Sequence, residues 1–434
     1  MALARRTLLR GALFGGGAAA LAPALSACGA SAAASTDAVQ YWNPFTGGDG
    51  ALMKEMVTEV QGAAPGLKVD TTVLDWGQSY YTKLAMASAG GRGPDVAIMH
   101  VSRFAGYAPG GLLDPWDMDL FREFGVTLDD INPVTGKRGR YDGDQYALPL
   151  DTHPFVVFYD KDVMDRAGLV DSDGRLIPFG GPDGYLEAAE KLRSVNKGGL
   201  GPVYGHVNDA AQNWRMFWSL YRQTGAEFVL TGKKTQVDRD TAVKVLTFMQ
   251  KLVAPQCRTM DPTTSVGSFA SRKAPMIFTG EWDSAAFSQI KGIELGAAPF
   301  PQIYDSPAGW ADAHMFVLPH QKNPDEERRR TVHRMVAELL KASFTWARAG
   351  HIPGYLPIVE SRKYRQLEPQ VEYAAAAKTP ALDPPAWFMG AGAEAQVQLC
   401  QAMQTALVGA NSAAVAVDKM IKALDFYLSK PDPA

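Results

Sequence analysis

The first hundred residues alternate between strand-like and helix-like hydrophobic patterns. Residues 39–42 (VQYW) predict a short strand, and apolar residues then recur with helical spacing over 52–60. Alternating residues at 67–73 predict a second strand, 78–88 a second helix and 95–99 a short buried parallel strand. This order is typical of a doubly wound α/β sheet, in which ligand-facing loops follow the carboxyl ends of the strands.

The pattern beyond residue 145 predicts a second α/β region. Apolar runs at 146–150 and 155–159 predict two strands, and we interpret the segment between them, 151–154, as the first crossing between two lobes. The residues after the proline-rich turn at 353–357 are expected to be mostly helical. Further elements are expected as helices at 183–194, 212–224, 239–253 and 325–349, and as short strands at 293–300 and 314–318.

The N-terminus has the pattern of a bacterial export signal. Arg5 and Arg6 precede Thr-Leu-Leu-Arg, which is the spacing of a twin-arginine signal, and a weakly apolar run ends on Leu-Ser-Ala-Cys, which looks like a lipobox. We expect residues 1–27 to be removed as a signal peptide and the thiol of Cys28 to receive lipid. Residues 28–36 are small and are expected to form a flexible tether. The mature protein would then be anchored at the extracellular face of the cytoplasmic membrane.

Two other interpretations of this segment stay open. A general secretory signal has the same positively charged start, so the export route is not decided by Arg5 and Arg6 alone. An ordinary membrane anchor is less consistent with the sequence, because the apolar run is short and is interrupted by glycines and Pro23.

Length and charge narrow the class of protein. Removing 27 of the 434 residues would leave 407, more than one ordinary domain contains, so two lobes are expected. The 43 Lys and Arg residues against 46 Asp and Glu give a net charge of −3, and a mildly acidic chain is not expected to bind nucleic acid. Cys257 and Cys400 could pair in an exported protein, but the sequence leaves this open.

The motifs of common enzymes are missing from the sequence. It contains no phosphate-binding loop, no dinucleotide-binding glycine motif, no nucleophile elbow, and no HExxH or CxxC. The seven histidines are scattered singly, so we predict no metal site, no cofactor and no catalytic residues. The nine tryptophans are a generous number for this length, and an excess of aromatic rings suits stacking on the apolar faces of sugars.

Eight short motifs occur in order along most of the chain. They are 41–50 (YWNPFTGGDG), 93–100 (GPDVAIMH), 110–114 (GGLLD), 146–154 (YALPLDTHP), 159–161 (YDK), 278–282 (FTGEW), 310–319 (WADAHMFVLP) and 350–353 (GHIP). Together they resemble the extracellular carbohydrate-binding proteins of ABC importers, the group that includes maltose-binding protein. The chain departs from maltose-binding protein at Ser102 and Arg103, where that relative has an acidic-basic pair. The identity of the sugar therefore cannot be inferred from maltose-binding protein.

The resemblance implies a fold, a function and partners. The fold is α/β and two-lobed, of the type II periplasmic-binding-protein kind, with doubly wound sheets joined by hinge strands. The expected N-terminal lobe comprises 37–151 and 300–345, and the C-terminal lobe comprises 152–299 and 346–434. A monomeric, non-enzymatic receptor would close on a sugar or oligosaccharide and deliver it to the ABC transporter permease.

The resemblance and the predicted topology single out candidate ligand-binding residues. Carboxylates, Asn and His can satisfy sugar hydroxyls, and tryptophans can stack on sugar faces, Trp282 being the strongest such candidate. Structural roles stay open: Asp49 could cap a helix, and Asp151 with His153 could form a hydrogen-bond network at the hinge. The candidates are Phe45, Asp49, His100, Asp151, His153, Asn213, Trp214, Glu281, Trp282, Trp310, Asp312 and Trp387.

Two alternative functions stay open. The same fold could bind a polyol or a glycerol-phosphate diester, which several Arg or Lys residues facing one phosphate would indicate. A secreted glycoside hydrolase would need a carboxyl pair beside the scissile bond, and no motif nominates such a pair.

Overall fold

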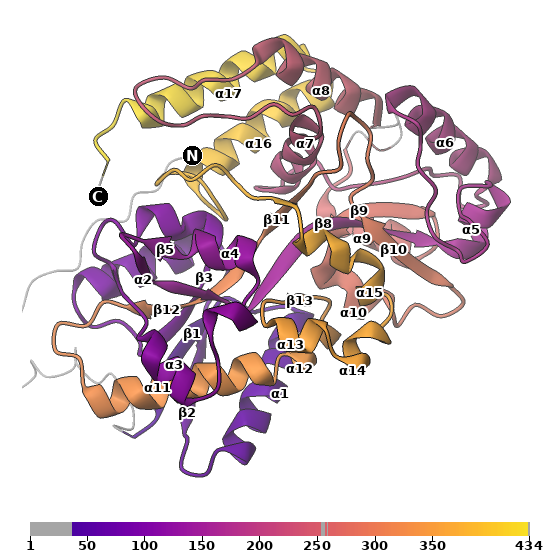
Figure 1. Cartoon of the computed structure of the whole chain (residues 1–434). Helices are drawn as coiled ribbons and strands as arrows, with labels where there is room; N and C mark the ends of the chain where they lie inside the picture. Colours follow the sequence, from indigo (N-terminus) through magenta and orange to yellow (C-terminus); the bar gives the residue numbers. More distant parts are fainter. Residues whose placement is uncertain (1–36, 253–256, 258, 433–434) are drawn as a thin grey trace, which may run out of the picture. The chain divides into compact units, whose positions relative to one another are not determined.

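The computed structural model describes residues 37–252, 257 and 259–432 (Figure 1). The predicted signal peptide at 1–27, the lipidation site Cys28 and the tether at 28–36 lie outside these residues, so their roles stay predictions. From Val39 onward the chain forms one unit. In the described part of the chain, no helix has both the length and the apolar character needed to cross a bilayer.

The first sheet contains the strands that the N-terminal pattern predicts. Its members are β1 (Val39–Asn43), β2 (Val69–Val73), β3 (Val96–His100), β4 (Leu113–Asp114), β7 (Ala147–Pro149) and β12 (His314–Pro319). The order is β2-β1-β3-β12-β4, with β7 also paired to β12. β1 is parallel to β2 and β3, whereas β12 is antiparallel to β3 and places His314 opposite His100.

The second sheet is arranged around one long strand. It comprises β8 (Asp151–Asp160), β9 (Met276–Gly280), β10 (Leu295–Pro299), β11 (Gly309–Asp312), β13 (Ile352–Pro353) and β14 (Pro380–Ala381). β9, β10, β11 and β13 all run antiparallel to β8, and β14 is parallel to β11. Every residue of β8 is buried, polar ones included.

The chain passes between the two sheets at single residues. Leu150 separates β7 from β8, and Ala313 separates β11 from β12. The two crossings are adjacent, because the Leu150 amide donates a hydrogen bond to the His314 carbonyl at 2.7 Å. The ends of four strands therefore meet at one place.

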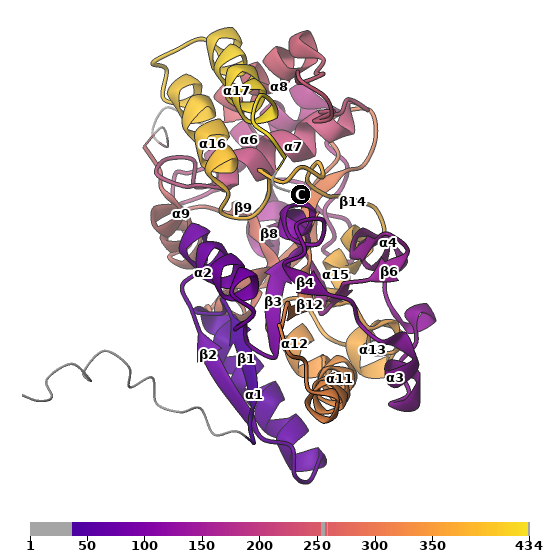
Figure 2. The ribbon, with the colours of Figure 1, turned by 90° about the vertical axis from the view of Figure 1, so that its left-hand side faces the viewer.

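Helices cover both sheets (Figures 1 and 2). Around the first sheet are α1 (Gly48–Ala63), α2 (Gln78–Ala89), α3 (Met118–Glu123), α4 (Pro133–Arg138), α11 (Glu326–Lys341) and α12 (Phe344–Arg348). Around the second are α5 (Lys161–Arg166), α6 (Pro182–Val195), α7 (Gln212–Gln223), α8 (Arg239–Leu252), α9 (Pro262–Ala270), α10 (Ser284–Phe287), α16 (Glu394–Leu407) and α17 (Ala413–Leu428).

Short elements complete the described chain. They are the 3₁₀ turns Val101–Gly106, Leu128–Asp130, Glu281–Asp283 and Ala374–Ala377, the hairpin β5 (Arg140–Tyr141) and β6 (Asp144–Gln145), and the helices α13 (Leu356–Val359), α14 (Arg362–Arg365) and α15 (Gln370–Tyr373).

Two local predictions are wrong, and one alternative that the sequence left open is excluded. The segment 151–154 is not a bridge between strands but the first part of β8. The helix predicted over 325–349 is two helices, because the Ser343 hydroxyl bonds back to the Leu340 carbonyl and α12 starts afresh. Asp49 lies inside the first turn of α1 and does not cap it, since Gly47 is the N-cap.

Hydrophobic cores lie under each sheet. One core joins β1, α1 and α11, and also includes Trp346 and Tyr355, which fall in the predicted C-terminal lobe. Another joins β8 to α7, α16 and α17. The division of the chain into 37–151 with 300–345, and 152–299 with 346–434, stays a prediction. Cys257 and Cys400 are both buried and free, so no disulfide joins them.

Candidate functional site

A cavity of about 550 Å³ opens between loops of the two sheets. The loop after β1, Trp76 after β2 and His100 at the end of β3 line one side, which is where a doubly wound sheet places its ligand loops. Residues from β8, α7 and the end of β9 line the other. The lining residues are 44–49, Trp76, His100, His153, Asp209, Ala211, Gln212, Arg215, Pro262, Thr263, Val266, Thr279, Trp282, Asp283, His314 and His351.

Trp282 presents an aromatic surface to this cavity and is only partly buried. The Arg215 guanidinium lies over its ring, 4.6 Å from the centroid, and 4.7 Å from the centroid of Trp310 behind it. Gly280 leaves room for the indole, because a Cβ there would come within 2.0 Å of the ring. The indole is therefore held in place before any ligand arrives.

Two carboxylates of the cavity resist ionisation. Burial raises the pKa of Asp49 above its ordinary value, although His314 and two backbone amides partly oppose the shift. Burial also raises the pKa of Asp283 to about 6, and the Thr279 hydroxyl donates a hydrogen bond to it at 2.7 Å. A raised pKa favours the protonated form of each carboxyl, which can donate as well as accept hydrogen bonds, as sugar hydroxyls require.

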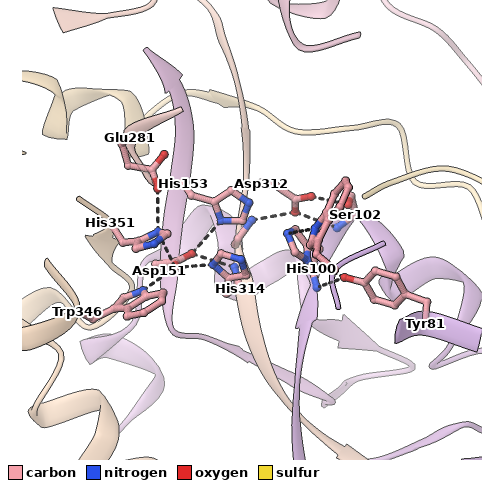
Figure 3. Close-up of polar contacts among 12 residues, drawn as sticks. Tyr81, His100, Ser102, Asp151, His153, Glu281, Asp312, His314, Trp346 and His351 are labelled. Carbon is pink, nitrogen blue, oxygen red and sulfur yellow. Dashed lines mark hydrogen bonds and ion pairs between the residues drawn. The ribbon is translucent and has the colours of Figure 1, made fainter. Parts of the chain in front are cut away.

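Imidazoles surround Asp151 at the floor of the cavity (Figure 3). Nδ1 of His314 lies 2.7 Å from Asp151 Oδ2, and Nδ1 of His153 lies 3.1 Å from Oδ1. The Trp346 indole donates to Oδ2 at 2.7 Å, and the His314 amide donates to Oδ1 at 2.9 Å. Nδ1 of His351 is 3.2 Å from Oδ2. One carboxylate thus gathers groups from four segments of the chain.

The charge of this group follows from burial and proximity. Burial opposes ionisation of Asp151, but His314, His351 and the hydrogen bonds of His153 and His314 hold its pKa well below the usual range. Burial would lower the pKa of His314, yet Asp151 raises it. Burial, reinforced by the charge of His314, lowers the pKa of His153 to about 4 and that of His351 to about 3. The Asp151–His314 pair therefore favours its charged forms, whereas His153 and His351 favour the neutral imidazole.

The cavity brings together five of the predicted site residues: Phe45, Asp49, His100, His153 and Trp282. Asp151 lies directly beneath them, fully buried. Phe45 packs edge-on against His314, with ring centroids 4.9 Å apart. His100 contacts the Tyr81 hydroxyl through Nδ1 at 2.6 Å.

The other predicted residues do not line the cavity. Trp214 and Trp310 are buried, and both indoles donate to Asp383 Oδ1 at 2.8 Å. Asp312 is buried and accepts hydrogen bonds from the Ser102 amide and hydroxyl. The remaining three also point elsewhere: the Asn213 amide bonds the His206 carbonyl, Glu281 is fully buried beside His351, and Trp387 packs against Phe388 and Tyr427.

Several cavity residues are absent from the sequence prediction. His314 and His351 lie within motifs already recognised, 310–319 and 350–353, so their place in the chain was a usable signal. Arg215 follows the Asn213-Trp214 pair by one residue, and helical rotation points Arg215 into the cavity and Trp214 into the core. The sequence around Trp76 contains no motif that would identify it as a cavity residue.

Comparison with known proteins decides the family. Residues 43–343 match the model of the bacterial extracellular solute-binding proteins. The chain belongs to this family. Among curated relatives of this solute-binding protein, the arabinooligosaccharide-binding protein of Bacillus subtilis is 27% identical over 238 residues, 52% of this chain and 49% of the relative. The chain thus spans about half the length of the curated relatives it matches.

Solved structures show that the solute-binding protein has the two-lobed maltose-binding-protein fold, as expected. The GacH receptor of Streptomyces glaucescens, solved with acarbose, superposes with a TM-score of 0.74 at 19% identity, covering 91% of this chain and 98% of GacH. UgpB of Mycobacterium tuberculosis, solved with glycerophosphocholine, also gives 0.74, at 18% identity, covering 90% and 98%. The family and these relatives are binding proteins, which excludes the glycoside hydrolase alternative.

Proposed function

We propose that this protein is the extracellular receptor of an ABC importer and binds a sugar or oligosaccharide in the cavity beside Trp282. The observation that carries the proposal is the indole of Trp282, fixed by Arg215 and Gly280 at the edge of the cavity. Sugars have apolar faces that stack on such rings. The ligand would pass from this cavity to the membrane permease.

The polar lining supports a hydroxyl-rich ligand. Asp49, Asp283, His100 and His153 surround the cavity with donors and acceptors of mixed character. The relatives point the same way, since one is named for binding arabino-oligosaccharides and GacH was solved with acarbose.

A glycerol-phosphate diester is the second candidate, because UgpB was solved with glycerophosphocholine and Arg215 reaches this cavity. Among the described lining residues Arg215 is the only Arg or Lys, and it is accompanied by Asp49, Asp209 and Asp283. This balance favours a neutral ligand over a phosphate.

The proposed location rests on the N-terminal sequence. A lipid on Cys28 would keep the receptor at the extracellular face of the membrane, and residues 28–36 would give it reach toward the permease. The protein is proposed to work as a monomer, without cofactor and without nucleic acid.

A ligand panel tests the binding proposal. Arabino-oligosaccharides, maltotriose, acarbose and glycerophosphocholine are each added to the purified protein, and thermal unfolding is followed. A ligand that binds the native state stabilises it by RT ln(1 + [L]/Kd), so the apparent Tm rises with the logarithm of the ligand concentration above Kd. Stabilisation by a saccharide supports the proposal, and stabilisation by glycerophosphocholine alone supports the second candidate. If the panel is extended to a broad set of glycans and none changes the Tm, the proposal that the ligand is a sugar is contradicted.

A further inference from the structure

Four side chains at the floor of the cavity combine the donor types of transition-metal sites. Asp151 and His153 come from β8, His314 begins β12 and His351 precedes β13. Each offers one ligand atom, and these four atoms lie within 4.8 Å of one another. Asp151 and His351 are 0% exposed, His153 is 2% and His314 is 6% exposed. The seven histidines are scattered singly in the sequence, so their spacing gave no indication of this cluster.

The spacing of the donors fits a small cation. The nitrogen-to-oxygen distances from Asp151 are 3.1 Å to His153, 2.7 Å to His314 and 3.2 Å to His351. Around a tetrahedral zinc ion, with bonds of about 2.0–2.1 Å, neighbouring ligand atoms are about 3.3 Å apart. All four ligand atoms lie within 4.8 Å of one another, so close pairs would separate and wider pairs would approach, by less than about an ångström per atom, to form a coordination sphere.

Unpartnered buried atoms provide a second, independent observation. Within the described chain, neither ring nitrogen of His351 and neither carboxylate oxygen of Glu281 makes a well-angled hydrogen bond. Nδ1 of His351 nevertheless lies 2.8 Å from Glu281 Oε1. A buried polar atom without a partner has given up its hydrogen bonds to water without replacement, which destabilises the folded state. A cation bound by His351 would give the imidazole a partner and bring a compensating charge close to Glu281.

We propose that Asp151, His153, His314 and His351 bind one divalent transition-metal ion, with Zn²⁺ the best match. Three imidazoles and one carboxylate suit zinc, whereas Mg²⁺ and Ca²⁺ require mostly oxygen ligands. The Trp346 indole already orients the carboxylate through its hydrogen bond to Oδ2. The ion would link β8 of the second sheet to β12 of the first, directly below the proposed solute.

Metal titration of the whole protein tests this inference. Protein stripped with a chelator and then exchanged into chelator-free buffer is titrated with ZnCl₂ by calorimetry, and its thermal unfolding is recorded with and without the ion. One equivalent of Zn²⁺ should bind and raise the Tm. With Co²⁺ as the probe, visible absorption of tetrahedral intensity should appear. A folded wild-type protein that binds no stoichiometric Zn²⁺ would overturn the inference.

Variants locate the ion. His153→Gln and His351→Gln should each weaken Zn²⁺ binding by more than the ~10–100-fold that follows loss of an orienting partner of a metal ligand. The matched control is His333→Gln, since His333 is also buried but bonds the Asp117 amide and the Arg329 carbonyl. It should bind Zn²⁺ like wild type. Unchanged affinity in both cluster variants would place the ion elsewhere.

One experiment distinguishes a failure of the proposed metal site from a failure of the proposed receptor function. The saccharide panel is repeated on the stripped protein and on the zinc-loaded protein. Saccharide binding without any Zn²⁺ binding would refute the metal site and leave the receptor function intact. Zn²⁺ binding without any response to a saccharide would support the metal site and contradict the proposed sugar-receptor function.

Discussion

Replacing Trp282 with Ala removes the surface that carries the sugar proposal. A sugar ring on the indole would cover about a third of the roughly 150–250 Å² that an aromatic side chain can bury, worth about 1.5 kcal/mol at about 25 cal/mol per Å². The face contact itself adds about 0.5 kcal/mol or more. The expected loss is therefore about 2 kcal/mol, which corresponds to a Kd about 30-fold weaker.

Isothermal calorimetry with the saccharide that gives the largest Tm shift measures this loss. Trp387→Ala is the matched control, because its indole packs against Phe388 and Tyr427 and does not line the cavity. It should bind like wild type. A Trp282→Ala protein that is folded and retains wild-type affinity would refute the stacking argument. An equal loss in both variants would show a general effect of tryptophan removal instead.

Four further predictions concern the cavity, its surroundings and the N-terminus. Gly280→Ala keeps the indole of Trp282 but displaces it, since the new Cβ would lie within 2.0 Å of the ring; calorimetry should show weaker saccharide binding, and full affinity would contradict this. The raised pKa of Asp283, about 6, favours the neutral acid in the folded state, so its contribution to stability is present below about pH 4 and lost as the pH rises through 6. Asp283→Asn should therefore be more stable than wild type at pH 7.5 by up to about 3 kcal/mol in urea unfolding and equal to it at pH 4; an equal difference at both pH values would exclude titration as the cause. Asp383→Ala leaves the buried indole N–H groups of Trp214 and Trp310 without an acceptor and should cost about 2–5 kcal/mol of unfolding free energy, whereas a loss below about 1 kcal/mol would mean that water replaces the carboxylate. Cys28→Ala should release the protein from the membrane fraction, and retention there would argue against lipidation at this residue.

The sequence predicted the elements whose pattern is local. β3 is a short run that is buried throughout, and its last residue, His100, reaches the cavity as the topology requires. The first part of β8 was missed because Asp151 and His153 are polar and Pro154 follows them. Their burial depends on His314, which is more than 160 residues away in the chain, so no window of local sequence contains the reason for it.

The candidate site shows the same limit. Trp282 and Phe45 follow strands in motifs that sequence alone can recognise, and both line the cavity. Trp214 and Trp310 were also predicted to bind the ligand, yet tertiary packing directs both toward Asp383. The gathering of three histidines around Asp151 required the two sheets to meet, which spacing along the chain cannot reveal.

The single-residue crossings at Leu150 and Ala313 have a mechanical consequence. If one sheet rotates relative to the other, changes in the backbone dihedral angles of Leu150 and Ala313 would absorb part of the rotation, so these two residues would form a hinge. The displacement of an atom grows with its distance from the hinge, so Asp151 and His314 would move little and remote helices would move most. A pair of spectroscopic labels should therefore be placed on α1 and α17, far from the hinge, where the change in the distance between the labels would be largest.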